Sequence, residues 1–379
     1  MNTVIVGVVL LVVAAVVLLK IMGRSRQQGQ RSAPPTPARA TSPSKHPAPA
    51  PEARPAAAPP VPPLDLPMEL QAFQRTTLDQ LTPERKAELT QRLSKLPRPP
   101  QSLQRLVSPD FVQTATSMEL SELVLGEPQV AAKVLATVNS PLYGLRQPVV
   151  SLGQGITFLG LNTVRGICVR YMLDHAFPAS DPATKRAFDR MWQASALASE
   201  LCVRLAPRIG LRDAGALVTQ VVLSFLGHQA ALALLNPDQI RAVQGQNLLE
   251  RTRLEQEWLG LGSAELGRLL MQAWALPATI VSSVHAVDQW LEAGPTQGPG
   301  DDGAALCYLC ARLGEKLAFG HWTDLTQHPL AEDDSLDLAQ AKHWLLARHG
   351  TSLSDALAAP ELQHALQPML PDTPGSSVT

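Results

Sequence analysis

Nine histidines and four cysteines are the side chains in this sequence whose types suit metal binding or nucleophilic chemistry. Cys307 and Cys310 have the spacing of a zinc or redox pair, but no second pair accompanies them. All four cysteines, which are Cys168, Cys202, Cys307 and Cys310, sit in apolar helical patterns. Apolar surroundings are typical of structural thiols, so we predict buried, reduced cysteines rather than a zinc or redox centre.

The sequence carries none of the compact motifs that predict hydrolysis or nucleotide binding. It contains no His-Asp dipeptide, no ordered Ser, His and Asp set, and no glycine-rich strand-to-helix loop for phosphate. The net charge of −1 also argues against nucleic acid, because proteins that bind it usually show a basic excess or stripe. A weaker hypothesis is nucleic-acid binding through four cations, Arg165, Arg170, Lys185 and Arg186.

Helices are the elements that must position these side chains. A first helix is predicted over Pro128–Asn139, and Pro141 prevents it from resuming. Ser151 is placed to cap a second helix, which ends at Gly160. Asn162 is placed to cap a third. These predictions describe a helix end, a tight turn, an extended crossing and two more helices.

No alternating strand pattern persists anywhere in the sequence, so we predict an all-α fold. Thr116 begins a capping box, which marks the start of a helix through Leu125. Further helices are predicted over Met68–Leu81, Pro83–Ser94, Thr184–Leu205, Ala214–Leu235, Leu254–Leu259, Ser263–Trp274, Pro277–Trp290, Ala304–Phe319 and Leu336–His349.

Several separated short motifs resemble, in their order, the N-terminal half of an HDOD domain. They are Leu96-Pro97, Gly126-Glu127-Pro128, Val138-Asn139-Ser140-Pro141-Leu142-Tyr143-Gly144 and Ile156–Arg165. The resemblance is strongest over residues 91–175 and continues more weakly to about residue 290. It implies a multi-helix HD-like bundle, since the HDOD family is an all-helical relative of the metal-dependent HD phosphohydrolases.

The resemblance also shows where metal ligands would have to stand. HD enzymes use histidines and a carboxylate to hold divalent metals, which turn bound water into a nucleophile. At the matching positions this chain has Ala194, Ser224, Phe225 and Ser263. His285 stands where catalytic members have two or more histidines. His228 is expected near it, yet two imidazoles without a carboxylate are a poor metal site. We therefore predict no metal, no cofactor and no catalytic residue.

What the resemblance implies is a bacterial signalling or scaffold component that binds a protein partner or a small ligand. The occupant would lie in the groove where metals sit in enzymes. The candidate binding residues are the motif residues Asn139, Ser140, Tyr143 and Gly144, for which a purely structural role is the competing interpretation. The alternative function is a residual metal-dependent phosphohydrolase acting on a nucleotide or cyclic dinucleotide.

The N-terminus carries an apolar run that begins directly after Met1-Asn2 and reaches Leu19. About 20 such residues span a bilayer core, so residues 1–23 are predicted to form a single transmembrane helix. A cleaved signal peptide is the alternative, but it would have its basic residues before the apolar run. Here the cations follow it, which predicts an outside N-terminus and a cytoplasmic body at the bacterial inner membrane.

A proline- and alanine-rich segment, residues 24–67, separates this run from the helices. Such a composition buries too little apolar surface to order the chain, so we predict a disordered linker. Its cations either hold it near anionic lipid or simply keep it solvated, and both interpretations stay open. The predicted organisation is a membrane anchor (1–23), the linker (24–67), a short helical lead-in (68–95), the HDOD-like domain (96–291), a C-terminal helical extension (304–370) and a loose tail (371–379).

Overall fold

The computed structural model describes residues 61–140, 145, 147–174, 176–177, 179, 181–292 and 301–371. Every regular element in these ranges is helical, which confirms the predicted all-α class. The chain from Ala57 onward forms one compact unit. The predicted anchor (1–23), most of the linker (24–67) and nearly all of the tail (371–379) lie outside the described residues, as do Tyr143 and Gly144.

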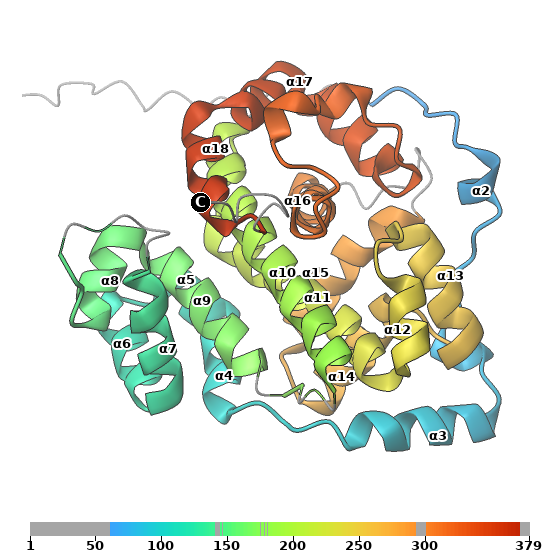
Figure 1. The fold of residues 1–379 in the computed structure, drawn as a ribbon, viewed down its shortest axis with the longest axis horizontal. Helices are drawn as coiled ribbons and strands as arrows, with labels where there is room; N and C mark the ends of the chain where they lie inside the picture. Colours follow the sequence, from blue (N-terminus) through green and yellow to red (C-terminus); the bar gives the residue numbers. More distant parts are fainter. Residues whose placement is uncertain are drawn as a thin grey trace, which may run out of the picture. The chain divides into compact units, whose positions relative to one another are not determined.

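The helices follow one another along the body as drawn in Figure 1. The first group is α2 (Met68–Gln71), η1 (Leu78–Gln80), α3 (Pro83–Ser94), α4 (Gln101–Val107), α5 (Pro109–Thr114), α6 (Ser117–Leu125), α7 (Pro128–Val138), α8 (Leu152–Leu159) and α9 (Leu161–Asp174). The second group is α10 (Pro182–Arg208), α11 (Ala214–Leu234), α12 (Pro237–Val243), α13 (Leu248–Leu259), α14 (Ser263–Ala273), α15 (Ala278–Asp288), η3 (Gln289–Leu291), α16 (Asp302–Ala318), η4 (Leu325–Gln327), η5 (Leu330–Glu332), η6 (Leu336–Leu338), α17 (Ala339–Ala358), α18 (Pro360–Leu366) and η7 (Gln367–Met369).

The lead-in is less helical than predicted. Met68–Leu81 contains only the single turn α2 and the 3-10 turn η1, rather than one amphipathic helix. Its backbone instead bonds to the body: Thr76 N–H donates to Gln256 Oε1 at 2.8 Å, and Leu78 N–H donates to Glu265 Oε1 at 3.4 Å. These contacts give the N–H groups partners that a helix would otherwise provide. Helix α3 has the predicted bounds, with Thr82 as its cap.

The central motif folds largely as its turn and cap residues predict. Helix α7 ends at Val138, and Ser151 caps α8, which stops where Gly160 takes a left-handed φ of 83°. Asn162 was predicted to cap the next helix, but α9 already begins at Leu161, so that prediction was wrong. Asn162 therefore lies inside the first turn of α9.

Two long helices and the later α16 form the centre of the body (Figure 1). Helix α11 is the one described helix that is long and apolar enough to cross a membrane, and 89% of its most apolar window is buried inside the body. From Gly303 to Ala318 every residue of α16 is buried except Lys316. Because α16 packs against α10 and α11, the C-terminal extension contributes to the core of the same unit.

Helix α17 is fixed to the start of α16 by polar contacts. The carboxylate of Asp302 accepts hydrogen bonds from Trp344 Nε1 at 2.8 Å and from Arg348 Nη2 at 3.0 Å. Its Oδ2 also lies 2.9 Å from His349 Nε2. At the other end, Met369 O accepts a hydrogen bond from Gln193 of α10 at 2.8 Å. The segment after α16 is thus bonded to α16 through α17 and to α10 through Met369.

Candidate functional site

The positions predicted to have lost their metal ligands lie on α10, α11 and α14, and all of them are buried. A Cβ atom at Gly314 of α16 would lie 2.5 Å from the carbonyl oxygen of Ala194, so α16 sits directly against that position. Ser224 donates its hydroxyl to Val221 O at 2.9 Å, which leaves it engaged with its own helix. The ring of Phe225 is fully buried.

Ser263 completes this set from α14. Its N–H donates to Glu255 Oε2 at 2.7 Å, so the carboxylate satisfies the start of the helix. Its carbonyl would lie 2.0 Å from a Cβ at Gly227, which shows how closely α11 and α14 approach. Two backbones in contact at Gly227 leave no space for a larger side chain there.

A cluster of buried charged residues, which we call the Arg–Glu cluster, lies beside these positions. It consists of His228, Arg251, Glu255, Arg312 and Glu315. Arg251 Nη2 and Arg312 Nη1 each lie 2.9 Å from a carboxylate oxygen of Glu315. His228 Nε2 lies 3.8 Å from the same carboxylate. Two guanidinium groups therefore supply the positive charge next to Glu315.

The protonation states in the Arg–Glu cluster follow from burial and from the arginines. Burial, with the charges of Arg251 and Arg312, holds the pKa of His228 well below its usual value, so its ring is neutral. Burial opposes ionisation of Glu315, but the two arginines outweigh it and keep its pKa low. Burial raises the pKa of Glu255 to about 7, against the pull of Arg251 and of the N–H of Ser263.

Two spaces adjoin this cluster. An open pocket of about 280 Å³ is lined by Arg312 and Glu315, together with Asn247, Lys316 and Asp337. A cavity of about 10 Å³ is lined by side chains that include Met191, His228, Arg251 and Glu255. A void of that size has room for roughly one water molecule. Within the described residues, no group of three or more His, Cys, Asp and Glu side chains is arranged to hold a metal ion. A partner helix or substrate does not fit into the cavity of about 10 Å³, so the predicted groove is not found on that side of the cluster.

The cysteines are all buried and free, as predicted for structural thiols. The sequence did not reveal that Cys202 of α10 lies beside Cys307 and Cys310 of α16. Cys307 also donates to Leu217 O at 3.3 Å. Burial raises the pKa of both Cys307 and Cys310 well above the usual value, so these two thiols are protonated.

Of the motif residues predicted to bind a partner, Asn139 has a clear structural role. Its amide donates to Val149 O at 2.8 Å, and its Oδ1 accepts from Val149 N–H at 2.6 Å. It also donates to Leu135 O at 2.9 Å. Asn139 thus ties the extended crossing to the end of α7. Ser140 is half-buried next to it, with its N–H bonded to Thr137 O at 3.1 Å.

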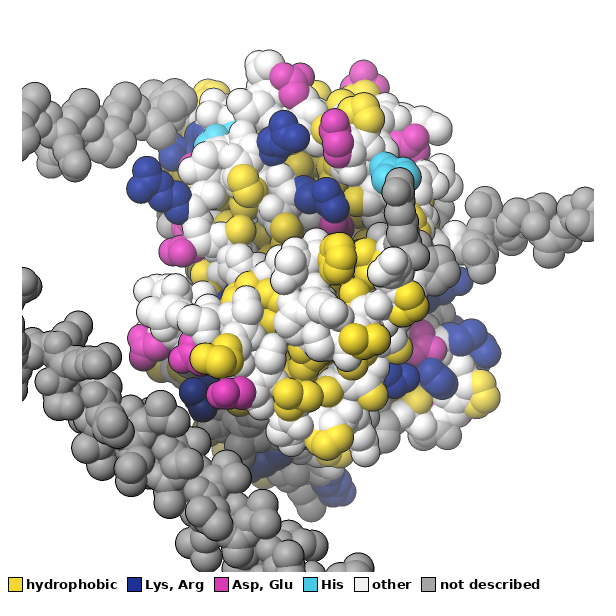
Figure 2. Space-filling model, turned by 90° about the vertical axis from the view of Figure 1, so that its left-hand side faces the viewer, with side chains coloured by type: hydrophobic (Ala, Val, Ile, Leu, Met, Phe, Trp, Pro, Cys, Tyr) yellow, Lys and Arg dark blue, Asp and Glu magenta, His cyan; other side chains and the backbone are white. Residues whose placement is uncertain are grey.

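A surface with exposed apolar side chains lies on α6 and at α8, close to this crossing. Figure 2 shows that hydrophobic side chains gather on the side of the body where these helices lie. The large exposed ones on these elements, which we call the α6–α8 patch, are Met118, Leu125, Val150 and Phe158, with 61% to 77% of their surface accessible. Clustered exposure of large apolar side chains is typical of an interaction surface.

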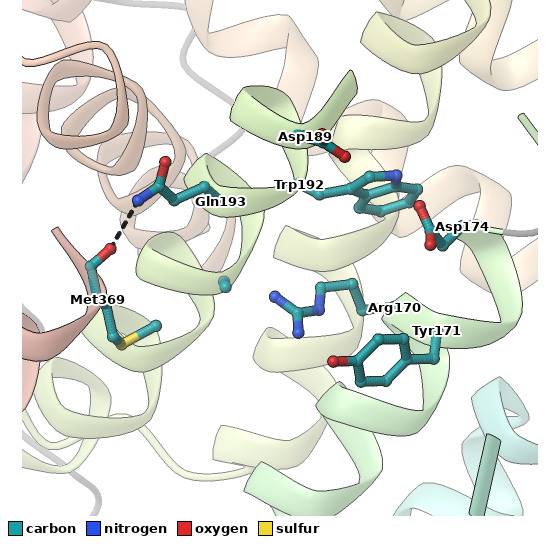
Figure 3. A pocket seen from close by; sticks show the side chains of 8 residues that line it. Arg170, Tyr171, Asp174, Asp189, Trp192, Gln193 and Met369 are labelled. Atoms are coloured by element: carbon teal, nitrogen blue, oxygen red, sulfur yellow. Dashed lines mark hydrogen bonds between the residues drawn. The ribbon is translucent and has the colours of Figure 1, made fainter. Parts of the chain in front are cut away.

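A second recess lies between α9, α10 and the chain end after α18 (Figure 3). Its volume is about 300 Å³, and its walls include Arg170, Asp174, Trp192, Gln193 and Met369. A pocket of this size lies at the lower end of the range for small-molecule sites. Sequence patterns did not predict it, because Met369 reaches it from the far end of the chain.

The four cations of the nucleic-acid hypothesis do not form one surface. Arg165 is fully buried, and its guanidinium donates to Val112 O at 3.3 Å and to Gly215 O. Burial lowers the pKa of Arg165 to about 10. Lys185 is paired with Asp189 at 2.9 Å. Arg165 therefore has a structural role and is not available to phosphates, which removes a main support of that hypothesis.

A comparison with protein families matches residues 96–290 to the HDOD domain. That match covers more than half of the chain. The chain belongs to the HDOD family. The HDOD match ends before α16, so the helices that close the Arg–Glu cluster and the recess of Figure 3 lie partly beyond it.

Solved structures of low sequence identity share the HDOD fold. An HDOD domain protein of unknown function from Geobacter sulfurreducens is 17% identical, with a TM-score of 0.51 over 76% of this chain and 96% of that one. A protein from Shewanella amazonensis SB2B that carries the provisional name phosphohydrolase is 18% identical, with a TM-score of 0.50 over 75% and 98%. At such identities the likeness concerns the fold alone. No curated protein matches the chain by sequence.

Proposed function

We propose that this protein is a non-catalytic bacterial signalling or scaffold component whose HDOD domain binds a protein partner or a small ligand. In this proposal residues 1–23 tether it to the cytoplasmic membrane and the body works in the cytoplasm. The observation that carries the non-catalytic part is the filling of the ligand positions. Phe225 is fully buried, α16 lies against Ala194, and the N–H of Ser263 is bonded to Glu255.

The positive charges of the Arg–Glu cluster also support a body that does not bind a catalytic metal. A divalent metal needs several neighbouring anionic or neutral ligands, and the buried anion here is already neutralised by Arg251 and Arg312. A cation added next to two guanidinium groups would be repelled in a buried setting. His228 Nε2 lies 3.5 Å from Arg312 Nη2, so a metal ion at that nitrogen would meet the guanidinium charge.

The α6–α8 patch supports partner binding. Its large apolar side chains lie on α6 and at α8, and Asn139 bonds to the extended crossing that leads into α8. A partner that covers the patch would gain about 25 cal/mol for each Å² of apolar surface removed from water. Protein interfaces commonly have such apolar centres.

The test is capture of partners by the full-length protein, with substitutions that change only the surface. We expect Phe158→Gln and Val150→Gln to abolish capture of a specific partner while the melting temperature stays unchanged, because both side chains are exposed. Met68→Gln is the matched control, since Met68 is 80% exposed but lies on α2. If the patch variants and the control capture the same proteins, the patch is not the docking surface.

A further inference from the structure

The recess of Figure 3 contains an unusual pair on α9. Arg170 and Asp174 are one helical turn apart, a spacing at which opposite charges normally approach each other. Yet they form no ion pair, and among the described residues neither side chain has a carboxylate or cationic partner within salt-bridge distance. Arg170 instead lies over the ring of Tyr171, with its Cζ 4.9 Å from the ring centre. Both charged groups line the same pocket.

Other polar groups at this recess also lack partners. Trp192 is only 6% exposed, and its indole N–H has no hydrogen-bond partner in the part of the chain that the structure describes. Gln193 uses its amide N–H₂ to hold Met369 O, so its Oε1 stays available as an acceptor. The recess therefore offers a donor on Arg170 and acceptors on Asp174 and Gln193.

The charge balance of the recess narrows the ligand class. Asp189 is neutralised by Lys185, at 2.9 Å, which leaves one cation and one carboxylate without partners among the described side chains that line it. A phosphate group alone would be attracted by Arg170 but repelled by Asp174. A cationic group would be attracted by Asp174 but repelled by Arg170. An uncharged molecule with both acceptors and donors on its edge satisfies both groups at once.

The walls favour a flat molecule. Trp192, Ala196 and Met369 contribute apolar surface, and the recess of about 300 Å³ lies between helices in Figure 3. Aromatic and thioether side chains pack well against planar rings. The guanidinium of Arg170 is held over Tyr171, so its N–H edge is oriented before a ligand arrives.

We propose that this recess binds a purine base with a carbonyl at C6 and an amino group at C2, as in guanine. The guanidinium of Arg170 donates to O6 and N7, the pairing that arginine commonly makes with guanine. The carboxylate of Asp174 accepts from the N1–H and the 2-amino group. Adenine offers an amino donor where the guanidinium needs an acceptor, so it fits less well.

A smaller cavity continues from the recess toward Ser195. Its volume is about 60 Å³, and it shares Arg170, Ala196 and Met369 with the larger recess. Ser195, which lines it, is fully buried, and its hydroxyl has no hydrogen-bond partner within the ranges described above. That hydroxyl is available to a ribose oxygen of the ligand.

This inference names a small ligand for the proposed signalling function. It rests on that proposed function in one respect, which is that the ligand is bound and not hydrolysed. The test is calorimetric titration of the full-length protein with GMP, IMP and AMP, which share the ribose phosphate and differ in the base. We expect GMP to bind most tightly and loss of the 2-amino group in IMP to weaken binding about tenfold. We expect AMP to bind more weakly still.

The variants Arg170→Gln and Asp174→Asn separate the two contacts. We expect Arg170→Gln to weaken GMP binding about tenfold or more, and Asp174→Asn to remove the preference for GMP over IMP. Arg208→Gln is the control, because Arg208 is exposed in the last turn of α10 and lines neither cavity. Equal affinity for the three nucleotides, or no binding of GMP, would overturn the inference. Partner capture through the α6–α8 patch would be untouched by either result, so the two proposals fail separately.

Discussion

The carbonyl oxygen of Ala194 lies so close to Gly314 that a Cβ atom on the glycine would be 2.5 Å from it. The same Cβ would lie 2.9 Å from the backbone nitrogen of Ala198. Helices α10 and α16 thus meet backbone to backbone at the position where an HD enzyme would place a histidine. The C-terminal extension therefore packs directly against Ala194 and is not an appended element.

This contact predicts that adding one methyl group at Gly314 lowers the free energy of unfolding, whereas the same change at an uncrowded helical glycine does not. Gly314→Ala should destabilise the protein by about 1–3 kcal/mol, because overpacking against the backbone outweighs the better helix propensity of alanine. Urea unfolding measures the change. Gly350→Ala in α17 is the control: a Cβ atom there would meet no other atom within 4 Å, so it should stabilise by about 0.5–1 kcal/mol. Equal effects at both sites would mean that α16 does not pack here.

Asn139 should prove important for stability. Asn139→Ala removes both bonds to Val149 and leaves backbone groups of the crossing without partners. We expect a loss of about 1–3 kcal/mol in the free energy of unfolding. Ser140→Ala, at the adjacent motif residue, should change it by less than about 0.5 kcal/mol. An Asn139→Ala protein with unchanged stability but without its partner would instead identify Asn139 as a binding residue.

The buried carboxyl of Glu255 predicts a pH dependence of definite sign. Its pKa rises from 4.5 in the unfolded chain to about 7 in the folded protein, so the folded state binds the extra proton between these values. The contribution of Glu255 to the free energy of unfolding should therefore fall as pH rises from 4.5 to 7. Glu255→Gln cannot titrate, so its stability relative to wild type should rise over that window, by on the order of 2 kcal/mol.

Thermal melts at pH 4.5, 5.5 and 7 check this difference. The matched control is Glu257→Gln, an exposed position on the same helix, which should show no comparable trend. A Glu255→Gln protein that lost stability as pH rose would show that Arg251 dominates and that the carboxyl is ionised in the folded state.

The four cysteines should be protected from alkylation. All of them are fully buried, and burial raises the pKa of Cys168 to about 12. A maleimide of ordinary size should label none of them in the folded protein and all four after unfolding in urea. Intact-mass measurement counts the labels. Rapid labelling of Cys202 in the folded protein would mean that α10 and α16 separate in solution.

Local signals in the sequence predicted most helices of this fold, because caps and breakers act over a few residues. Thr82, Thr116 and Ser151 cap the helices that they were expected to cap. The prediction of one helix over Met68–Leu81 was wrong, because this segment bonds to partners such as Glu265, which is almost 200 residues away. These distant contacts override its local helical pattern.

The candidate sites depended more on distant contacts. Ala194 and Phe225 were recognised from the family pattern, but nothing local indicates that Arg251 and Arg312 meet at Glu315. The Arg170 and Asp174 spacing was visible in the sequence. The pocket that these two residues line was not visible, because another of its walls is Met369, almost 200 residues later in the chain. Short-range patterns cannot identify a pocket whose walls are joined only by tertiary packing.

The central claim is that the HDOD body binds without catalysing hydrolysis, and its most direct test combines metal content with turnover. The full-length protein, purified without chelator, is analysed by elemental mass spectrometry and then incubated with Mn²⁺ and a cyclic dinucleotide. We predict far less than one metal ion per chain and no phosphodiester cleavage above that of buffer. A stoichiometric divalent metal together with Mn²⁺-dependent cleavage would contradict the account.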